Sequence, residues 1–244
     1  MRAPRLIYVG GVYHIVARCN NRQYFFNDNE DFDLYLTMLN KARDKYGVSI
    51  HGFCMTNNHI HLILGTPDNK NLSLFMQYSQ GHFAKAYNKK YKKTGHFWTG
   101  RYHSTIIESE EYYMNCLFYV ELNMTRNGVT KHPKEWRYSS YGQHAYGKGI
   151  FKIDYHDQYL QLGSSPKQRQ KKYRQIMQSA MKEKGLLKKQ QPLTYGIIYG
   201  SKQFVQNIIQ KHANHKYYEK RKNYKTQEKE IYTLRKAKAN IDSS

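Results

Sequence analysis

The short stretch from His59 to Leu64, in which His59 and His61 alternate with apolar residues, constrains the fold more than any other part of the chain. Successive side chains of a β-strand point to opposite faces, so a strand here has one apolar face, formed by Ile60, Leu62 and Leu64, and one face that carries the histidines. Two neutral imidazoles at a fixed separation are suitable donors for a divalent metal ion. The alternative, two surface histidines on a half-exposed strand, stays open on this motif alone.

The segments around this strand have the patterns of further strands and helices. Runs rich in β-branched and aromatic residues favour strands, and apolar residues at the spacing of one helical face favour helices. Asp28 or Asn29 can cap the first helix, and Gly47 ends it. The predicted order is strand 11–18, helix 29–46, strand 48–55, strand 59–64, helix 72–91, strand 101–107 and helix 109–126.

This order is the split βαβ arrangement of ferredoxin-like domains, an α+β fold in which helices pack on one face of an antiparallel sheet. We therefore predict such a domain over residues 1–150. If the two earlier helices cover the apolar face of strand 59–64, the histidine face is left free for a ligand.

The helix predicted over residues 109–126 offers two more polar side chains to that face. Tyr119 and Asn123 are four residues apart, so they lie one above the other on the same side of a helix. If the helix lies along the histidine face, Asn123 can offer an amide oxygen as a third metal ligand, with Tyr119 beside the same ion. A Tyr and an Asn one turn apart are also common on any helix, so the pair alone does not decide between a site and ordinary packing.

The charge of the chain indicates a polyanionic partner. Lys and Arg number 40 against 18 Asp and Glu, which gives a formal net charge of +22. Neutralising phosphates supplies most of the affinity of proteins for nucleic acid, and the 24 tyrosines suit stacking on unpaired bases. An anionic membrane surface is the competing partner, but no long apolar run and no basic amphipathic helix with a bulky apolar face is present, so no membrane association is expected.

The cysteines and the N-terminus favour a cytoplasmic protein. Cys19, Cys54 and Cys116 are scattered and odd in number, as expected of reduced thiols. The basic residues at the N-terminus are followed by an apolar stretch that is too short and too interrupted for a signal peptide.

Five motifs in a fixed order resemble the IS200-like (Y1) transposases. These belong to the HUH single-strand endonucleases and include the relatives associated with repetitive extragenic palindromes. The likeness covers the predicted ferredoxin-like domain. The motifs are GGVYHIVAR at 10–18, NHIHL at 58–62, FWTGRYHS at 97–104, YVELN at 119–123 and WRYSSY at 136–141.

The resemblance implies a role for each site residue. In the family a His-hydrophobe-His pair binds a divalent metal, which matches His59 and His61, and the nucleophilic tyrosine precedes an Asn by four residues, which matches Tyr119 and Asn123. The implied reaction is attack of Tyr119 on a phosphate of single-stranded or hairpin DNA, with a 5′-phosphotyrosine intermediate. The implied cofactor is Mg²⁺ or Mn²⁺, of which Mn²⁺ accepts imidazole more readily.

The sequence also departs from the family pattern. Asn57 stands where the family has a Pro in the turn before the histidines, and Met124 stands where it has a Pro after the Asn. The third ligand varies within the family and is a Gln in some branches. Tyr112 and Tyr113 lie close enough in the sequence to be alternative nucleophiles.

Residues 151–244 carry a net charge of +14, from 21 basic and 7 acidic residues. We predict a basic, mainly helical C-terminal region that extends DNA binding, with helices over 166–184 and 201–212, the second capped by Ser201. Residues 216–238 are expected to fold only on contact with DNA or to remain a loose arm. A solvated appendage is the alternative. Basic candidates for DNA contact elsewhere in the chain are Arg18, Arg22, Arg101, Lys89, Lys90 and Arg126.

The leading hypothesis is a metal-dependent tyrosine transposase or a related single-strand nickase. The alternative is a non-catalytic module that binds single-stranded nucleic acid, because a ferredoxin-like sheet with exposed aromatics and basic flanks also describes RNA-binding folds. A zinc-stabilised regulator is a third hypothesis. The sequence leaves open whether the protein is a homodimer or a monomer.

Overall fold

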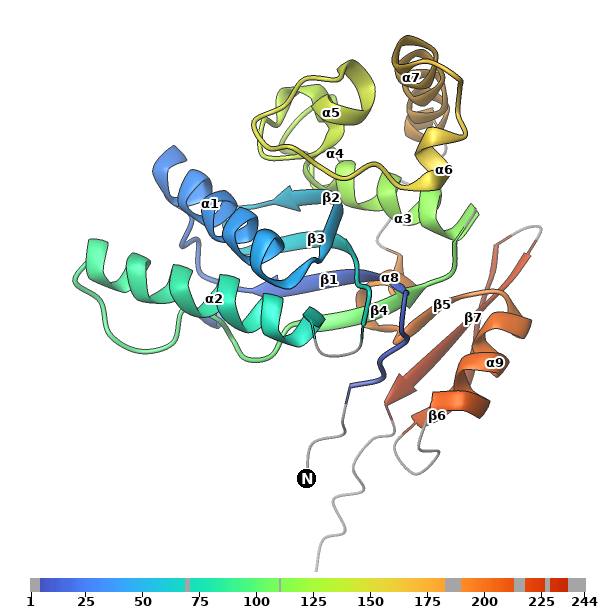
Figure 1. The fold of residues 1–244 in the computed structure, drawn as a ribbon, viewed down its shortest axis with the longest axis horizontal. Coiled ribbons are helices and arrows are strands. Elements are labelled where there is room, and N and C mark those ends of the chain that lie inside the picture. Colours follow the sequence, from blue (N-terminus) through green and yellow to red (C-terminus); the bar gives the residue numbers. More distant parts are fainter. Residues whose placement is uncertain are drawn as a thin grey trace, which may run out of the picture.

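The computed structural model describes residues 5–68, 71–109, 111–182, 190–212, 218–226 and 229–236. The first half of the chain follows the predicted order of elements (Figure 1), and four strands pair antiparallel in the order β2-β3-β1-β4. The predicted ferredoxin-like α+β fold is therefore confirmed. These elements are β1 (Val12–Arg18), α1 (Asn29–Tyr46), β2 (Ser49–Met55), β3 (His59–Gly65), α2 (Asn71–Lys90), β4 (His103–Ile107) and α3 (Glu111–Glu121).

The ends of α1 follow from local chemistry. The carboxylate of Asp28 accepts a hydrogen bond of 2.9 Å from the backbone N–H of Asp31, so Asp28 rather than Asn29 is the cap. Gly47 has a φ of 61° and donates its N–H to the carbonyl of Arg43. This left-handed conformation favours glycine, which explains why the helix ends there.

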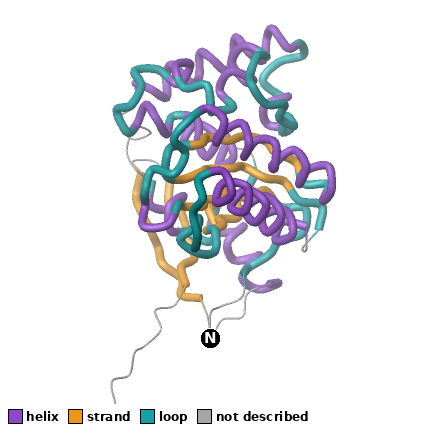
Figure 2. The backbone as a smooth tube through the Cα atoms, turned by 90° about the vertical axis from the view of Figure 1, so that its left-hand side faces the viewer, coloured by secondary structure: helices purple, strands orange, loops and turns teal. Residues whose placement is uncertain are grey.

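Helices α1 and α2 cover the apolar face of the sheet, and Figure 2 shows both in front of the strands. Ile60, Leu62 and Leu64 of β3 are buried in one cluster with residues of both helices, such as Leu39 and Phe83. The side of the strand predicted to be apolar is thus the side that faces the main core.

The opposite face of the sheet is covered as well, so the prediction that it stays free is wrong. Apolar residues of α3, including Leu117 and Val120, pack on β2 and β3 in a second buried cluster. A later helix, α8 (Gln191–Tyr195), covers the neighbouring part of this face and adds Leu193 to the same cluster. The helix that carries Tyr119 therefore lies along the histidine face, and α8 adds a cover that the sequence did not predict.

The C-terminal region adds three strands to the same sheet. β5 (Ile198–Gly200) pairs parallel with β4, and β7 (Lys229–Lys236) and β6 (Tyr218–Thr226) continue the sheet as an antiparallel hairpin. Residues 218–226 and 229–236, which were expected to be a loose or DNA-dependent arm, form this hairpin in the structure. The hydrogen bonds that join β7 to β5 use main-chain groups and do not depend on the side chains. The composition of this segment therefore did not reveal the hairpin.

The predicted helices of this region are confirmed by α7 (Pro166–Lys182) and α9 (Lys202–His212). Ser201 caps α9, because its hydroxyl accepts a hydrogen bond of 3.2 Å from the backbone N–H of Phe204. Within the described residues no helix is long and apolar enough to cross a membrane. The short helices are α4 (Asn123–Arg126), α5 (Tyr141–Tyr146) and α6 (Asp157–Leu160), with single 3-10 turns at Asn20–Arg22 and Pro133–Glu135.

A buried carboxylate joins the two halves of the chain. Glu121, at the end of α3, is 1% exposed. Its Oε1 accepts hydrogen bonds from Ser140 Oγ (2.6 Å) and His144 Nδ1 (2.7 Å), and its Oε2 accepts one from the hydroxyl of Tyr173 in α7 (2.6 Å). Burial and the nearby carboxylate raise the pKa of Tyr173 well above its usual value, so the phenol stays a donor. The division at residue 150 stays a prediction, but both regions share the sheet and its two cores.

Candidate functional site

Three of the predicted site residues meet on the face of the sheet opposite α1 and α2. His61 and Asn123 are 4% and 2% exposed, and His61 Nε2 lies 3.0 Å from Asn123 Nδ2. The ring of Tyr119 stands edge-on to the ring of His61, with 6.1 Å between their centroids. β3 and the start of α4 thus bring together His61 and Asn123, which are 62 positions apart in the sequence.

His59 lies beside His61, with 5.0 Å between the ring centroids. Its Nδ1 is 2.5 Å from Asn58 Oδ1 and 2.8 Å from Thr56 Oγ1. The Asn58 side chain donates from Nδ2 to the carbonyl oxygen of Arg22 (3.3 Å). This bond fixes the orientation of the amide, so Oδ1 faces the imidazole of His59. Since Oδ1 can only accept, His59 carries its hydrogen on Nδ1 and its lone pair on Nε2.

Burial keeps His61 neutral. The pKa of His61 is lowered well below its usual value, first by burial and then by unfavourable electrostatic interactions with the neighbouring His59 and His14 and with the guanidinium groups of Arg126 and Arg18. A neutral imidazole retains a lone pair for a metal ion. The chemistry of the two histidines therefore fits a divalent cation.

The third ligand is less simple than the sequence predicted. Within the described residues, no group of three or more His, Cys, Asp or Glu side chains is arranged to hold a metal ion. Asn123 turns its Nδ2 toward His61, while its Oδ1 accepts a hydrogen bond of 3.1 Å from Asn127 Nδ2. To act as a ligand beside His61, the amide of Asn123 has to exchange the positions of its oxygen and nitrogen.

Tyr119 is 3% exposed and held by contacts on two sides. Its hydroxyl lies 3.2 Å from Thr194 Oγ1, and the Thr194 hydroxyl donates to the carbonyl oxygen of Gln190 (2.8 Å). The Tyr119 hydroxyl is therefore the donor to Thr194. The guanidinium of Arg126 lies 3.9 Å from the centre of the Tyr119 ring and donates to the Tyr119 carbonyl oxygen.

Arg126 occupies a second short helix, because the helix predicted over residues 109–126 is interrupted. α3 ends at Glu121 and α4 begins at Asn123, with Leu122 between them at a ψ of 4°. The prediction of one continuous helix over residues 109–126 is therefore wrong at Leu122. Asn123 and Arg126 nevertheless remain close to Tyr119, so the predicted grouping is retained.

The site carries positive charge and lacks acidic side chains. Arg18 pairs with His59 across β1 and β3, so it lies on the same face. In the described part of the chain, neither Arg18 nor Arg126 forms an ion pair with a carboxylate. Burial lowers the pKa of Arg126, a cost that a bound anion would offset. Guanidinium groups without carboxylate partners suit the phosphates of a nucleic acid.

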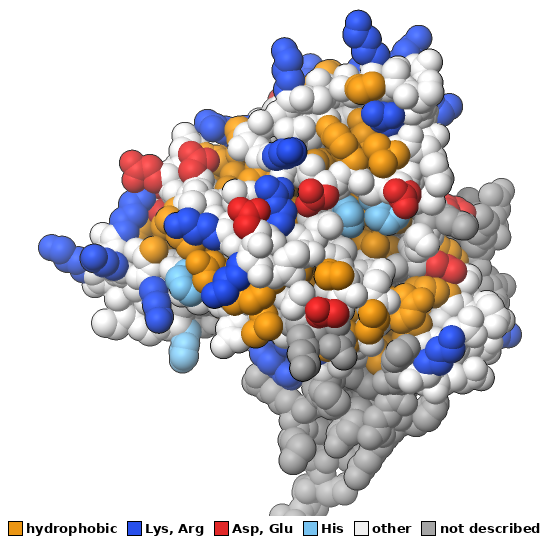
Figure 3. Space-filling view, viewed as in Figure 1, with side chains coloured by type: hydrophobic (Ala, Val, Ile, Leu, Met, Phe, Trp, Pro, Cys, Tyr) orange, Lys and Arg blue, Asp and Glu red, His pale blue; other side chains and the backbone are white. Residues whose placement is uncertain are grey.

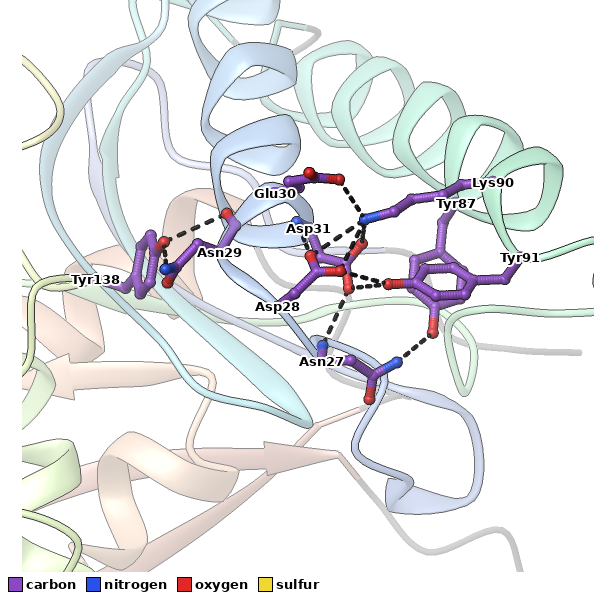
Figure 4. A network of polar contacts seen from close by, with 9 residues as sticks. All are labelled: Asn27, Asp28, Asn29, Glu30, Asp31, Tyr87, Lys90, Tyr91 and Tyr138. Carbon is purple, nitrogen blue, oxygen red and sulfur yellow. Dashed lines mark hydrogen bonds and ion pairs between the residues drawn. The ribbon is translucent and has the colours of Figure 1, made fainter.

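The other basic candidates are surface residues. Arg22, Arg101 and Lys89 are exposed. Figure 3 shows Lys and Arg side chains projecting over the end of α2 and over α7. Lys90 differs from them, because its ammonium lies 3.0 Å from carboxylate oxygens of three acidic residues, as Figure 4 shows. Its charge is already matched within the protein, which argues against a role in binding DNA. The three residues are Asp28, Glu30 and Asp31.

Sequence reasoning missed two residues that touch the site. His14 of β1 lies 2.8 Å from His61 through its Nε2, and its position on the histidine face follows from strand alternation once β1 is known to neighbour β3. Thr194 contacts Tyr119 from 75 positions away, and no pattern in the sequence connects them.

Comparisons with known proteins find similarity to one family of transposases. A family model described as "Transposase IS200 like" matches residues 8–123. A REP-associated tyrosine transposase of Haemophilus influenzae is 25% identical over 145 residues, which cover 54% of this chain and 80% of that protein. A solved structure of a REP-associated tyrosine transposase bound to a REP hairpin is similar with a TM-score of 0.50 and 16% identity, over 64% of this chain and 91% of the other. At that identity the likeness shows the fold.

Proposed function

We propose that the chain, whose residues 8–123 match the IS200-like transposase family model, is a transposase of this kind that cuts and rejoins single-stranded DNA, with Tyr119 as nucleophile and a divalent metal ion as cofactor. The observation that carries the proposal is the convergence of an imidazole, an amide and a phenol on one buried face. His61 Nε2 lies 3.0 Å from Asn123, and the His61 and Tyr119 rings are 6.1 Å apart.

Tyr119 forms the covalent bond in this proposal. Its Oη bonds to the phosphorus of the scissile phosphate, and the bond from phosphorus to the 3′ oxygen breaks. The proton lost by the phenol balances the proton gained by the 3′ oxygen. The product is a 5′-phosphotyrosine and a free 3′-hydroxyl, and a 3′-hydroxyl of another strand can reverse the step, so no nucleotide cofactor is needed.

Arg126 assists this chemistry through its charge. The guanidinium lies 3.9 Å from the centre of the Tyr119 ring, so it holds the ring and brings a positive charge beside the phosphate that Tyr119 attacks. Arg18, opposite His59, is placed to bind a phosphate of the strand. Arg22, Arg101 and Lys89 remain candidates for contacts with DNA farther from the site.

His59 and His61 would hold the metal ion, with the amide oxygen of Asn123 as third ligand after the amide turns. Bound there, the ion would polarise the scissile phosphate and stabilise the charge that develops on it. Imidazole donors favour Mn²⁺ at least as much as Mg²⁺. The proposed DNA partner is a single strand with a hairpin, which agrees with the net charge of +22 and with the REP hairpin that the similar solved transposase binds.

The test is formation of a covalent adduct with a labelled single-stranded hairpin oligonucleotide. We expect the wild-type protein to give an adduct on denaturing gels with Mn²⁺ or Mg²⁺, and the Tyr119→Phe variant to give none. Tyr112→Phe is the matched control, because Tyr112 lies on the same helix and contacts Tyr199 rather than the histidines.

An adduct that survives in Tyr119→Phe and disappears in Tyr112→Phe would contradict the assignment of the nucleophile. DNA binding by the wild-type protein without any adduct, across a range of hairpins and both metals, would favour the non-catalytic binding module instead.

A further inference from the structure

We propose that His14 is a positioning residue that fixes the tautomer of His61, so that His61 presents the lone pair of Nε2 toward Asn123 and the metal position. The inference rests on the proposed function, because it concerns the ligand geometry of that site. It also adds a role for the C-terminal region, which lies beyond the family match at residues 8–123.

The sheet sets the two imidazoles side by side. On β1 and β3, His14 pairs with Ile63 and Val16 pairs with His61, so the two histidines are diagonal neighbours on one face. His14 Nε2 lies 2.8 Å from His61 Nδ1. The rings are within 6° of parallel with 5.1 Å between their centroids, so they meet edge to edge, as a straight N–H···N bond requires.

A backbone carbonyl determines which nitrogen carries the hydrogen. His14 Nδ1 lies 3.1 Å from the carbonyl oxygen of Leu193, and an oxygen of this kind can only accept. His14 therefore carries its hydrogen on Nδ1. Its ring is fully buried, and its other nitrogen, Nε2, faces His61. On the far side of His61, Asn123 Oδ1 accepts a hydrogen bond from Asn127, so Asn123 Nδ2 donates to His61 Nε2, and His61 Nδ1 is left to donate to His14 Nε2.

The state of His14 determines the tautomer of His61. Because His14 Nε2 accepts, His61 Nδ1 has to donate, and the lone pair of neutral His61 lies on Nε2. In this structure that lone pair accepts a hydrogen bond of 3.0 Å from the amide of Asn123. A neutral histidine side chain in water favours the other tautomer, so His61 needs a partner at Nδ1 to present Nε2 as a ligand.

The two proposed ligands are fixed by different routes. His59 receives its orientation from Asn58 in the adjoining turn, whereas His61 receives it through His14 from Leu193. Residues that orient a ligand in this way commonly change metal affinity by about 10- to 100-fold when they are replaced. Because Leu193 belongs to α8, this helix helps to fix the orientation of His61.

The test uses the full chain and a readout that needs neither metal nor DNA. Nitrogen-15 NMR of histidine-labelled protein distinguishes the two tautomers of each imidazole. We expect His61 to carry its hydrogen on Nδ1 in the wild type and to lose that preference in His14→Phe. The control is His82→Phe, because His82 lies on α2, on the other side of the sheet, where its Nδ1 contacts the backbone carbonyl of Tyr78.

A second pair of variants keeps the test valid if His14→Phe fails to fold. In His14→Gln the longer amide can reach His61 Nδ1 and accept its hydrogen, whereas in His14→Asn the shorter amide reaches only Leu193. We expect Mn²⁺ affinity, measured by titration calorimetry, to fall about 10- to 100-fold in His14→Asn and to be restored to near the wild-type value in His14→Gln.

Three results would overturn the inference. They are a wild-type His61 with its hydrogen on Nε2, an unchanged tautomer in His14→Phe or His14→Asn, and equal loss of Mn²⁺ affinity in His14→Asn and His14→Gln. Failure of the proposed function looks different. In that case the His61 tautomer is as expected in the wild type and changes in His14→Phe and His14→Asn, but the wild-type protein forms no adduct with DNA or binds no Mn²⁺.

Discussion

The imidazole of His156 illustrates how burial alone sets the charge of a side chain away from the candidate site. Its ring stacks on Tyr113 with 4.0 Å between centroids, and its Nδ1 accepts a hydrogen bond from the backbone N–H of Gln158 at the start of α6. Burial, helped by the nearby His51, lowers the pKa of His156 to about 4. Protonation of Nδ1 would remove the acceptor that caps the helix.

This shift predicts how stability depends on pH. Between about pH 6.5 and about pH 4 the unfolded chain binds a proton at His156 that the folded protein does not, so the free energy of unfolding falls as the pH falls through this range. In His156→Asn, which can still cap α6, this loss should be smaller. Urea unfolding midpoints from pH 4 to pH 8 check it. Equal slopes for both proteins would contradict the prediction.

At the scale of elements, the sequence was most informative where a pattern is local. The strand with His59 and His61 and the capped helix α1 follow from alternation, periodicity and the residues Asp28 and Gly47. The histidines, Tyr119 and Asn123 on the site's face were predicted, but the contact with α8 was not, because Thr194 lies 75 positions beyond Tyr119. Long-range docking of a short helix leaves no periodic signal in a single sequence.

The ion cluster between α1 and α2 gives a prediction at this scale. Asp31 is fully buried, and its side-chain partners are Lys90, the last residue of α2, and Tyr91, which follows it. Lys90→Met should lower the urea midpoint, because it leaves the Asp31 carboxylate without its ammonium. Lys89→Met, at an exposed neighbouring position, should leave the midpoint unchanged.

DNA affinity at several salt concentrations separates the two lysines further. We expect the salt dependence of binding to stay unchanged in Lys90→Met, since a charge already matched by three carboxylates releases no counterion from DNA. A shallower salt dependence in Lys90→Met than in Lys89→Met would mean that Lys90 binds phosphate despite the cluster.

At the scale of the whole molecule, the two regions share one sheet and both hydrophobic clusters. Glu121 joins α3 to α5 and α7 through three hydrogen bonds, and β5 continues the sheet beside β4. Sequence composition favoured a boundary at residue 150 because the charge changes there, but charge reports on the surface and not on which apolar residues share a core.

We therefore expect a single cooperative unfolding transition, measured by tryptophan fluorescence and by far-UV circular dichroism in urea. Glu121→Gln should lower the free energy of unfolding by about 3 kcal/mol, because it disrupts a buried and fully bonded carboxylate. The exposed Glu135→Gln is the control and should change stability little. Two separate transitions, or a Glu121→Gln effect confined to one of them, would contradict this prediction.

The hydrogen bond between His14 and the carbonyl of Leu193 has a consequence for synthesis. A ribosome delivers His14 179 residues before Leu193, so the early strands emerge and pair while the group that orients His61 is still untranslated. A nascent chain would then hold a folded sheet in which His59 is oriented by its own turn and His61 is not yet fixed. The proposed metal site would become complete only once translation has passed α8.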